Sequence, residues 1–141
     1  MPNSSQSIED YLERIYELIQ EKGYARAVDI AGALSIRQSS VTKMIKNLDE
    51  KGYVVYEKYR GLTLTPKGAH LARSVRNRHG TLEKLLRLLG VAETILQRDV
   101  EGIEHHISPK ALRAIGQLVT FLDMHPEFLR AFKRARRGQE R

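Results

Sequence analysis

The sequence predicts a mainly α-helical protein with one short β-hairpin, and two patterns carry this prediction. Through most of the 141 residues, apolar side chains recur every three or four positions, the spacing that gives a helix one buried face. Residues 53–64 break this pattern, because β-branched and aromatic residues flank a charged turn that contains a glycine. Such a segment is typical of a two-stranded hairpin.

Three helices are expected before the hairpin. The first begins at Ser7 and ends at Lys22-Gly23, the second spans about residues 27–34, and the third spans about residues 37–51. Ser35-Ile36 forms the turn between the last two, and Gly52 follows as a C-terminal cap, a position that favours glycine. The apolar stripes expected to face the core are Ile8, Tyr11, Leu12, Ile15, Leu18 and Ile19 in the first helix, and Val41, Met44, Ile45 and Leu48 in the third.

Four helices are expected after the hairpin, whose strands cover residues 53–56 and 62–64. Thr65-Pro66 and Ser108-Pro109 each place a capping hydroxyl before a proline, and proline favours the first position of a helix. Gly80 is a weak point within the first of these helices, because glycine disfavours a helix interior. The expected spans are residues 66–89, 92–107 and 109–125, followed by a last helix that opens at Pro126.

The composition limits the classes of site that this chain can form. It has no cysteine, which excludes disulfides, zinc–thiolate sites and thiol chemistry. A metal site must therefore use oxygen and imidazole ligands. Neither a charged-then-apolar leader nor a run of roughly 18 apolar residues is present, so we expect a cytoplasmic protein without a membrane span.

The charge balance favours an anionic partner. The chain carries 24 Lys and Arg against 17 Asp and Glu, a net charge of +7, and such a balance suits contacts with the phosphates of a nucleic acid. The segment from Arg130 to Arg141 is especially basic, with Glu140 as its one acid. This segment is either a phosphate contact or a disordered, solvated tail.

Helix, turn, helix and hairpin together predict a winged helix-turn-helix DNA-binding domain in residues 1–65, followed by an all-helical domain in residues 66–141. A recognition helix presents the side chains of its N-terminal part to base edges in the major groove, and basic residues of a wing suit phosphate or the minor groove. The alternative is a helical bundle with a solvated face. The candidate DNA-binding residues are Arg37, Gln38, Ser39, Ser40, Thr42, Lys43 and Lys46 in the third helix, with Lys58 and Arg60 in the wing.

Two groups of metal-ligating residues share helix faces. Asp10 and Glu13 are three residues apart, and Glu101, Glu104 and His105 follow at i, i+3 and i+4. Two like charges one turn apart cost about 0.2–0.5 kcal/mol without a counterion. Four carboxylates also match the charge of two divalent cations. These spacings predict two chelating faces, one weak and one moderately specific.

Each of these residues also has an ordinary structural explanation. Ser7 and Asp10 match the start of a capping box, and Asp10 can pair with Arg14 one turn later. Glu13 can be solvated surface, since Glu9 and Glu17 flank it. Other ordinary roles are an ion pair of Glu101 with Arg98, and polar surface positions for His79 and His106.

Six segments together resemble the diphtheria toxin repressor family, in its manganese transport regulator branch. The resemblance covers about residues 7–125, and the last segment is the most specific. The segments are Ile8–Tyr16, Glu21–Arg26, Ser39–Met44, Tyr56–Leu62, Arg78-His79 and Asp99–His106.

The resemblance implies a manganese-responsive repressor of metal-uptake genes. Members of this branch are homodimers that bind a palindromic operator in double-stranded DNA when a binuclear Mn(II) site is filled, and they are not enzymes. His79 joins the site only through this match, because its spacing alone does not place it. The ligand positions of the family fall on Asp10, Glu13, His79, Glu101, Glu104 and His105.

Several functional alternatives stay open at this point. Iron-responsive relatives carry methionine at the position that matches Asp10, and an iron- or zinc-responsive repressor of the same family is the nearest alternative. A metal-independent winged-helix regulator and a di-metal hydrolase or oxidoreductase are more distant. The chain also departs from close relatives at Arg37-Gln38, where they often have His-Pro, and at Gly80-Thr81.

Overall fold

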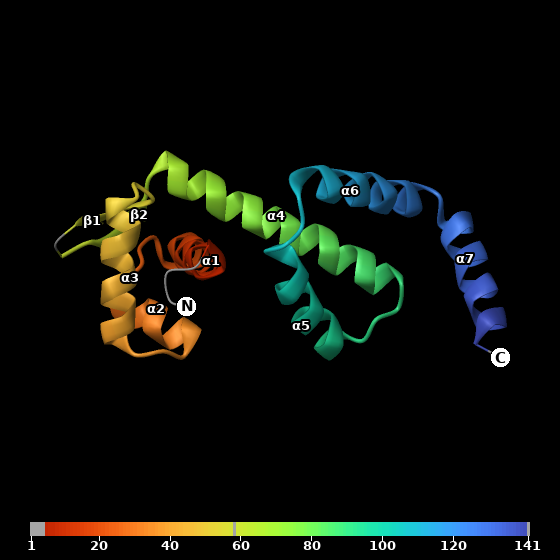
Figure 1. Cartoon of the computed structure of the whole chain (residues 1–141), viewed down its shortest axis with the longest axis horizontal. Helices are drawn as coiled ribbons and strands as arrows, with labels where there is room; N and C mark the ends of the chain where they lie inside the picture. Colours follow the sequence, from red (N-terminus) through yellow and green to blue (C-terminus); the bar gives the residue numbers. More distant parts are fainter. Residues whose placement is uncertain (1–4, 58, 141) are drawn as a thin grey trace. The chain divides into compact units, whose positions relative to one another are not determined.

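The computed structural model describes residues 5–57 and 59–140, and it divides the chain into two compact units. Unit 1 comprises residues 1–76 and unit 2 comprises residues 77–141. In Figure 1, unit 1 contains the red-to-yellow helices and the hairpin, and unit 2 contains the blue-green and blue helices. The boundary between the units falls within one long helix, α4 (Pro66–Leu88).

Unit 1 has the predicted order of three helices followed by a hairpin. Its elements are α1 (Ser5–Lys22), α2 (Ala27–Leu34), α3 (Gln38–Glu50), β1 (Val54–Glu57), β2 (Gly61–Leu64) and the first part of α4. The two strands are antiparallel, and their register pairs Val54 with Leu64 and Glu57 with Gly61. The winged helix-turn-helix prediction is confirmed, although β1 begins and ends one residue later than expected.

One apolar core joins all the elements of unit 1. Leu12 and Ile15 of α1, Val41 and Leu48 of α3, and Leu62 of β2 are fully buried. The predicted stripes of α1 and α3 all contribute to this core, with Leu18 and Ile19 only partly buried. Ala72 of α4 is buried in the same core. The removal of these apolar side chains from water is the main favourable contribution to the folding of unit 1.

Helix α1 begins earlier than the sequence predicted, and this affects the explanation offered for Ser7 and Asp10. Because α1 already includes Ser5, Ser7 lies inside the helix and has helical backbone geometry. An N-cap residue has non-helical geometry and precedes the first turn. The capping-box explanation for Ser7 and Asp10 is therefore wrong, and Asp10 is left as an interior residue of α1.

Thr65 ties the start of α4 to the end of α3. Its hydroxyl accepts from the backbone N–H of Gly68 at 3.1 Å and donates to the carbonyl of Gly52 at 2.6 Å. Gly52 has φ +79°, which confirms it as the glycine after α3. A Cβ atom on Gly68 would clash with the carbonyl oxygen of Tyr53. The first turn of α4 therefore lies in direct contact with the backbone just before β1.

The wing is anchored to the segment between α1 and α2. The N–H of Leu62 donates to the carbonyl of Ala25 at 2.7 Å. Gly61 has φ +90°, and a Cβ atom there would lie 2.5 Å from the same carbonyl oxygen. Glycine at this position therefore allows the hairpin to lie against Ala25.

Unit 2 consists of the rest of α4 with α5 (Glu93–Glu104), α6 (Pro109–Met124) and α7 (Pro126–Gln139). Its buried core is small and contains Leu82, Leu96, Val100 and Leu112. Ser108 accepts from the N–H of Ala111 at 3.1 Å, which confirms its capping role. No helix in the described part of the chain is long and apolar enough to cross a membrane.

Three expectations about unit 2 can be compared with its helices. Helix α4 runs through Gly80, the expected weak point, and ends at Leu88, one residue earlier than expected; Val75 before Gly80 and Leu82 after it are buried. Helix α5 ends at Glu104 rather than near residue 107. The basic segment is helical to Gln139 rather than disordered, and Arg136 donates to the carbonyl of Leu89 at 2.6 Å. Arg141 lies outside the described residues.

The close approach at Gly68 predicts a large difference between two glycine substitutions. Gly68→Ala forces the Tyr53 backbone to move and should destabilise the protein by about 1–3 kcal/mol, the usual cost of overpacking. The matched control is Gly32→Ala in α2, where an added Cβ meets nothing within 4 Å; this variant should be as stable as wild type or slightly more so. Urea unfolding followed by circular dichroism measures both, and equal midpoints would contradict the close contact.

Candidate metal centre and nucleic-acid interface

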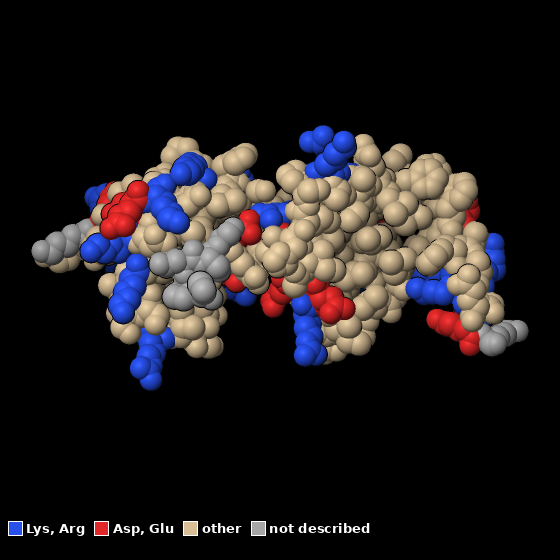
Figure 2. Space-filling view, viewed as in Figure 1, with Lys and Arg blue, Asp and Glu red and all other residues tan. Residues whose placement is uncertain are grey.

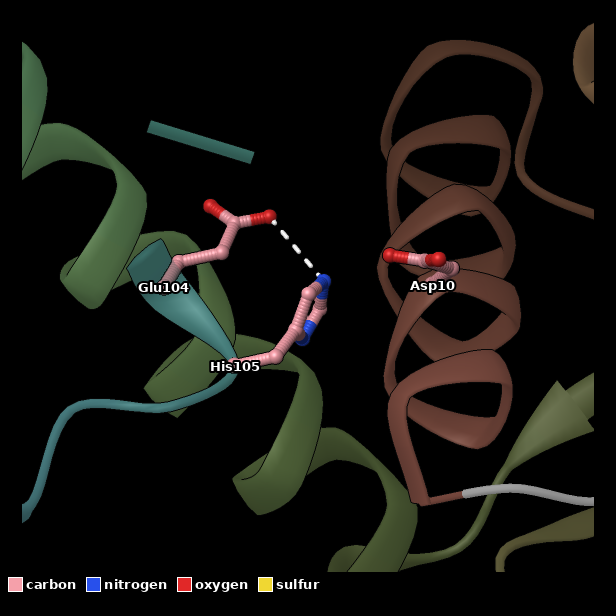
Figure 3. A group of neighbouring side chains, drawn as sticks. All are labelled: Asp10, Glu104 and His105. Carbon is pink, nitrogen blue, oxygen red and sulfur yellow. Dashed lines mark ion pairs between the residues drawn. The ribbon is translucent and has the colours of Figure 1, made fainter. Parts of the chain in front are cut away.

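A buried carboxylate at the end of α5 lies between two imidazoles in unit 2. The Oε2 atom of Glu104 is 2.7 Å from Nδ1 of His79, and its Oε1 atom is 3.4 Å from Nε2 of His105. Figure 3 shows Glu104 and His105 next to each other in the chain, with the second contact as a dashed line. The Glu104 side chain is only 3% exposed, so its charge requires these polar partners.

Helix α4 holds Glu104 by two neighbouring residues. His79 contacts the carboxylate, and Arg78 donates from its guanidinium to the backbone carbonyl of Glu104 at 2.9 Å. This carbonyl belongs to the last residue of α5, where helix carbonyls lack a partner within the helix. A positive charge at a helix C-terminus is also favourable. The end of α5 is therefore fastened to α4 through both its backbone and its side chain.

His79 has a second carboxylate partner that sequence analysis missed. Its Nε2 atom is 3.0 Å from Oε2 of Glu83, one turn later on α4. The other oxygen of Glu83 accepts from Arg87 at 2.8 Å, and Arg87 also bonds Glu93 of α5 at 2.6 Å. The hydrogen bond from Arg87 lowers the pKa of Glu83 and that of Glu93. The i, i+4 spacing of His79 and Glu83 on one helix could have predicted this contact from the sequence.

The other predicted ligands lie on two helices. Asp10 and Glu13 belong to α1, and Figure 3 shows the Asp10 carboxylate projecting from that helix. Glu13 is partly buried, so it is not plain solvated surface. Arg14, considered as a partner of Asp10, bonds Glu17 at 2.8 Å. Glu101 on α5 is exposed.

The predicted DNA-binding residues of α3 lie on one accessible surface. All seven are exposed, while Val41, Met44, Ile45 and Leu48 of the same helix are buried. Arg37 is the N-cap and the helix begins at Gln38, one residue later than expected. On the face in Figure 2, several Lys and Arg side chains project from the part of unit 1 that contains α3 and the hairpin.

The wing adds an aromatic residue that sequence analysis did not select. Tyr59 at its tip is 85% exposed and has φ +74°. The side chain of Arg60 is also highly exposed, and it lies 3.7 Å from Glu57. Lys58, the other predicted wing residue, lies outside the described residues. Its position as an aromatic residue in a charged turn could have identified Tyr59 from the sequence.

Two family models match almost the whole chain. The first, described as "Iron dependent repressor, N-terminal DNA binding domain", covers residues 4–62, and the second, "Iron dependent repressor, metal binding and dimerisation domain", covers residues 65–131. The chain belongs to the iron-dependent (diphtheria toxin) repressor family. Proteins of this family are repressors that bind DNA. This chain is therefore a transcription regulator and not an enzyme. DNA and a second copy of the chain are its partners.

Curated relatives and solved structures agree with this family. The chain is 53% identical to the HTH-type transcriptional regulator MntR of Geobacillus kaustophilus over 134 residues, 95% of each chain. It is 50% identical to the regulator MntR of Listeria welshimeri, over 90% of this chain and 89% of the relative. These matches confirm the resemblance to the MntR branch.

Similar solved structures include two longer metal-dependent regulators. The manganese regulator SloR has a TM-score of 0.72 and 29% identity, and the metal-dependent transcriptional regulator MtsR has a TM-score of 0.76 and 25% identity. The matches cover 81% and 86% of this chain. The chain spans only about half of those structures, 54% and 55% of their lengths.

The contact of Arg78 with the end of α5 predicts a loss of stability in metal-free protein. Arg78→Ala leaves the carbonyl of Glu104 without this donor, which should cost about 1–3 kcal/mol. Arg98→Ala is the matched control, since Arg98 is exposed on α5 and its loss should change stability little. Chemical unfolding in a metal chelator measures both variants. Equal stabilities would show that Arg78 does not hold α5.

Proposed function

We propose that this chain is a manganese-responsive DNA-binding repressor of metal-uptake genes, switched on by a binuclear Mn(II) site. The observation that carries the proposal is the buried Glu104 carboxylate placed between His79 and His105. The MntR name of its relatives and the manganese regulator among similar structures support the choice of metal. A regulator of this kind acts in the cytoplasm, where the DNA lies.

The donor set fits manganese. The proposed ligands combine carboxylates with imidazoles, the donors that suit Mn(II) and neighbouring divalent metals. Each oxygen of Glu104 already faces a different ring nitrogen, at 2.7 and 3.4 Å. Four carboxylates balance the charge of two divalent ions. The proposed set is Asp10 and Glu13 from unit 1, and His79, Glu101, Glu104 and His105 from unit 2.

Helix α1 transmits the effect of the ligands to the DNA-binding surface. Asp10 and Glu13 lie on α1, and Leu12 and Ile15 of the same helix share one core with Val41 and Leu48 of α3. Holding α1 therefore also holds α3, which carries the exposed polar residues from Arg37 to Lys46. When bound, the metal supplies the positive charge that lets the carboxylates of the two units be ligands together. Without it, their mutual repulsion opposes this arrangement.

The DNA partner follows from the dimer. In this proposal residues 1–65 form the DNA-binding domain, and residues 66–141 form the metal-binding and dimerisation domain. Two recognition helices in a symmetric dimer require a palindromic operator with half-sites about 34 Å apart, or a multiple of that spacing. Coupling between metal and DNA sites is typically about 1–3 kcal/mol.

Iron or zinc is the alternative activator. Raw affinity for such ligands rises from manganese towards the later transition metals, and one similar solved structure is that of ScaR with bound Zn2+. Selectivity for manganese must therefore come from ligand geometry and from the metals available in the cell.

Metal-dependent DNA binding tests the proposal. Duplexes selected from a random-sequence pool by Mn(II)-loaded protein should bind about 5–150-fold more tightly with Mn(II) than with chelator, as expected for this coupling. Titrations with Fe(II), under anaerobic conditions, and Zn(II) give the metal ranking. The variant Glu104→Gln should lose the metal response and keep the weak binding seen in chelator. Wild-type binding that does not change on chelation would support a metal-independent regulator instead.

Asp10 tests the basis of metal selectivity. Asp10→Met replaces a hard carboxylate oxygen with a soft thioether, which manganese binds poorly. The variant should respond less to Mn(II) relative to Fe(II) in the same DNA-binding titration. Glu9→Met, at the neighbouring position on α1, serves as the control. An unchanged metal ranking in Asp10→Met would contradict the role assigned to Asp10.

A further inference from the structure

A chain of charged side chains leads away from His79 on the side opposite to Glu104. Glu83 contacts Nε2 of His79 at 3.0 Å, and Arg87 binds the second oxygen of Glu83 at 2.8 Å. Arg87 in turn bonds Glu93, the first residue of α5, at 2.6 Å. All four residues belong to unit 2, so this chain links α4 and α5 at a second point, away from Glu104.

The two nitrogens of His79 face different carboxylates. Nδ1 lies 2.7 Å from Glu104 and Nε2 lies 3.0 Å from Glu83. A neutral imidazole carries one N–H donor and one lone pair. If Nε2–H donates to Glu83, the lone pair is on Nδ1 and points towards Glu104. The hydrogen bond of one ring nitrogen thus decides which nitrogen can bind a metal.

We infer that Glu83 is a positioning residue that fixes the tautomer and the ring orientation of His79, so that Nδ1 and Glu104 bind the same metal ion. This inference rests on the proposed function. Glu83 does not ligate that ion, because the two nitrogens point outward from opposite edges of the ring. Arg87 keeps the Glu83 carboxylate in place through its hydrogen bond to the second carboxylate oxygen, and this bond does not involve Glu93.

The fixed position of Glu83 separates this role from a simple surface ion pair. Both of its oxygens are engaged, one by His79 and one by Arg87, and its side chain is 24% exposed. Carboxylates that hold metal-binding histidines in this way typically contribute about 10–100-fold to metal affinity.

Calorimetric titration of the full chain with Mn(II) measures the contribution of Glu83. Glu83→Ala should weaken binding about 10–100-fold, and Glu83→Gln should recover most of the loss, because its amide oxygen still accepts from Nε2–H. Glu93→Ala is the matched control: it also removes a carboxylate from Arg87 but does not contact His79, so its affinity should stay close to wild type. Unfolding of the metal-free variants checks that each is folded.

A spectroscopic measurement tests the tautomer directly. NMR of protein loaded with an NMR-active cadmium isotope, with labelled histidine nitrogens, should show coupling from cadmium to Nδ1 of His79 and a proton on Nε2. In Glu83→Ala the Nε2 proton should exchange faster with water. Coupling from cadmium to Nε2 would overturn the inference, since Glu83 would then be placed as a ligand.

His79→Ala separates failure of this inference from failure of the proposed function. If wild type takes up no Mn(II), or if His79→Ala binds it as tightly as wild type, both are overturned. If His79→Ala weakens binding and Glu83→Ala does not, the metal site stands and the role of Glu83 alone is overturned.

Discussion

The buried carboxylate of Glu104 is the constraint around which unit 2 is organised. Removing a charged group from water costs several kcal/mol unless polar partners replace the lost hydration. Here the partners are His79 and His105 at the carboxylate and Arg78 at the backbone carbonyl of the same residue. The C-terminal end of α5 must meet the middle of α4 for the cost to be offset. The apolar core of unit 2 is small: four buried side chains form it among the described residues, and only Leu96 and Val100 of these have no exposed surface.

Unit 1 is organised by apolar burial instead. Leu12, Ile15, Val41 and Leu48 have no exposed surface, and together they make α1 and α3 parts of one packed body. The polar side chains of the two helices lie on faces outside this core. Asp10 and Glu13 belong to α1, and the exposed polar residues proposed to contact DNA belong to α3. In the proposed mechanism this shared core is what lets a ligand on α1 influence α3, because close-packed interiors transmit displacement rather than absorb it.

Much of the fold was predictable because it depends on local patterns. The stripes of α1 and α3, the hairpin, and the caps at Thr65 and Ser108 all follow from residues near one another in the sequence. Three features considered from local preference do not describe the structure: the capping box at Ser7, a weak point at Gly80 and a disordered tail. In each case a helix continues through the residues concerned. The contact of Arg136 with the carbonyl of Leu89 joins residues far apart in the chain, and no local pattern reports it.

The candidate site shows the same division. The sequence by itself determined the type of ligand, since a chain without cysteine offers only oxygen and imidazole donors, and it placed Glu104 and His105 side by side. Only the tertiary structure decided that Glu104 is buried, that His79 faces it, and that Arg78 and Glu83 hold the two partners. The physical reason is distance along the chain: the last part of α4, the connection after it and α5 separate His79 from Glu104. Their contact exists only because the apolar faces of those helices pack together.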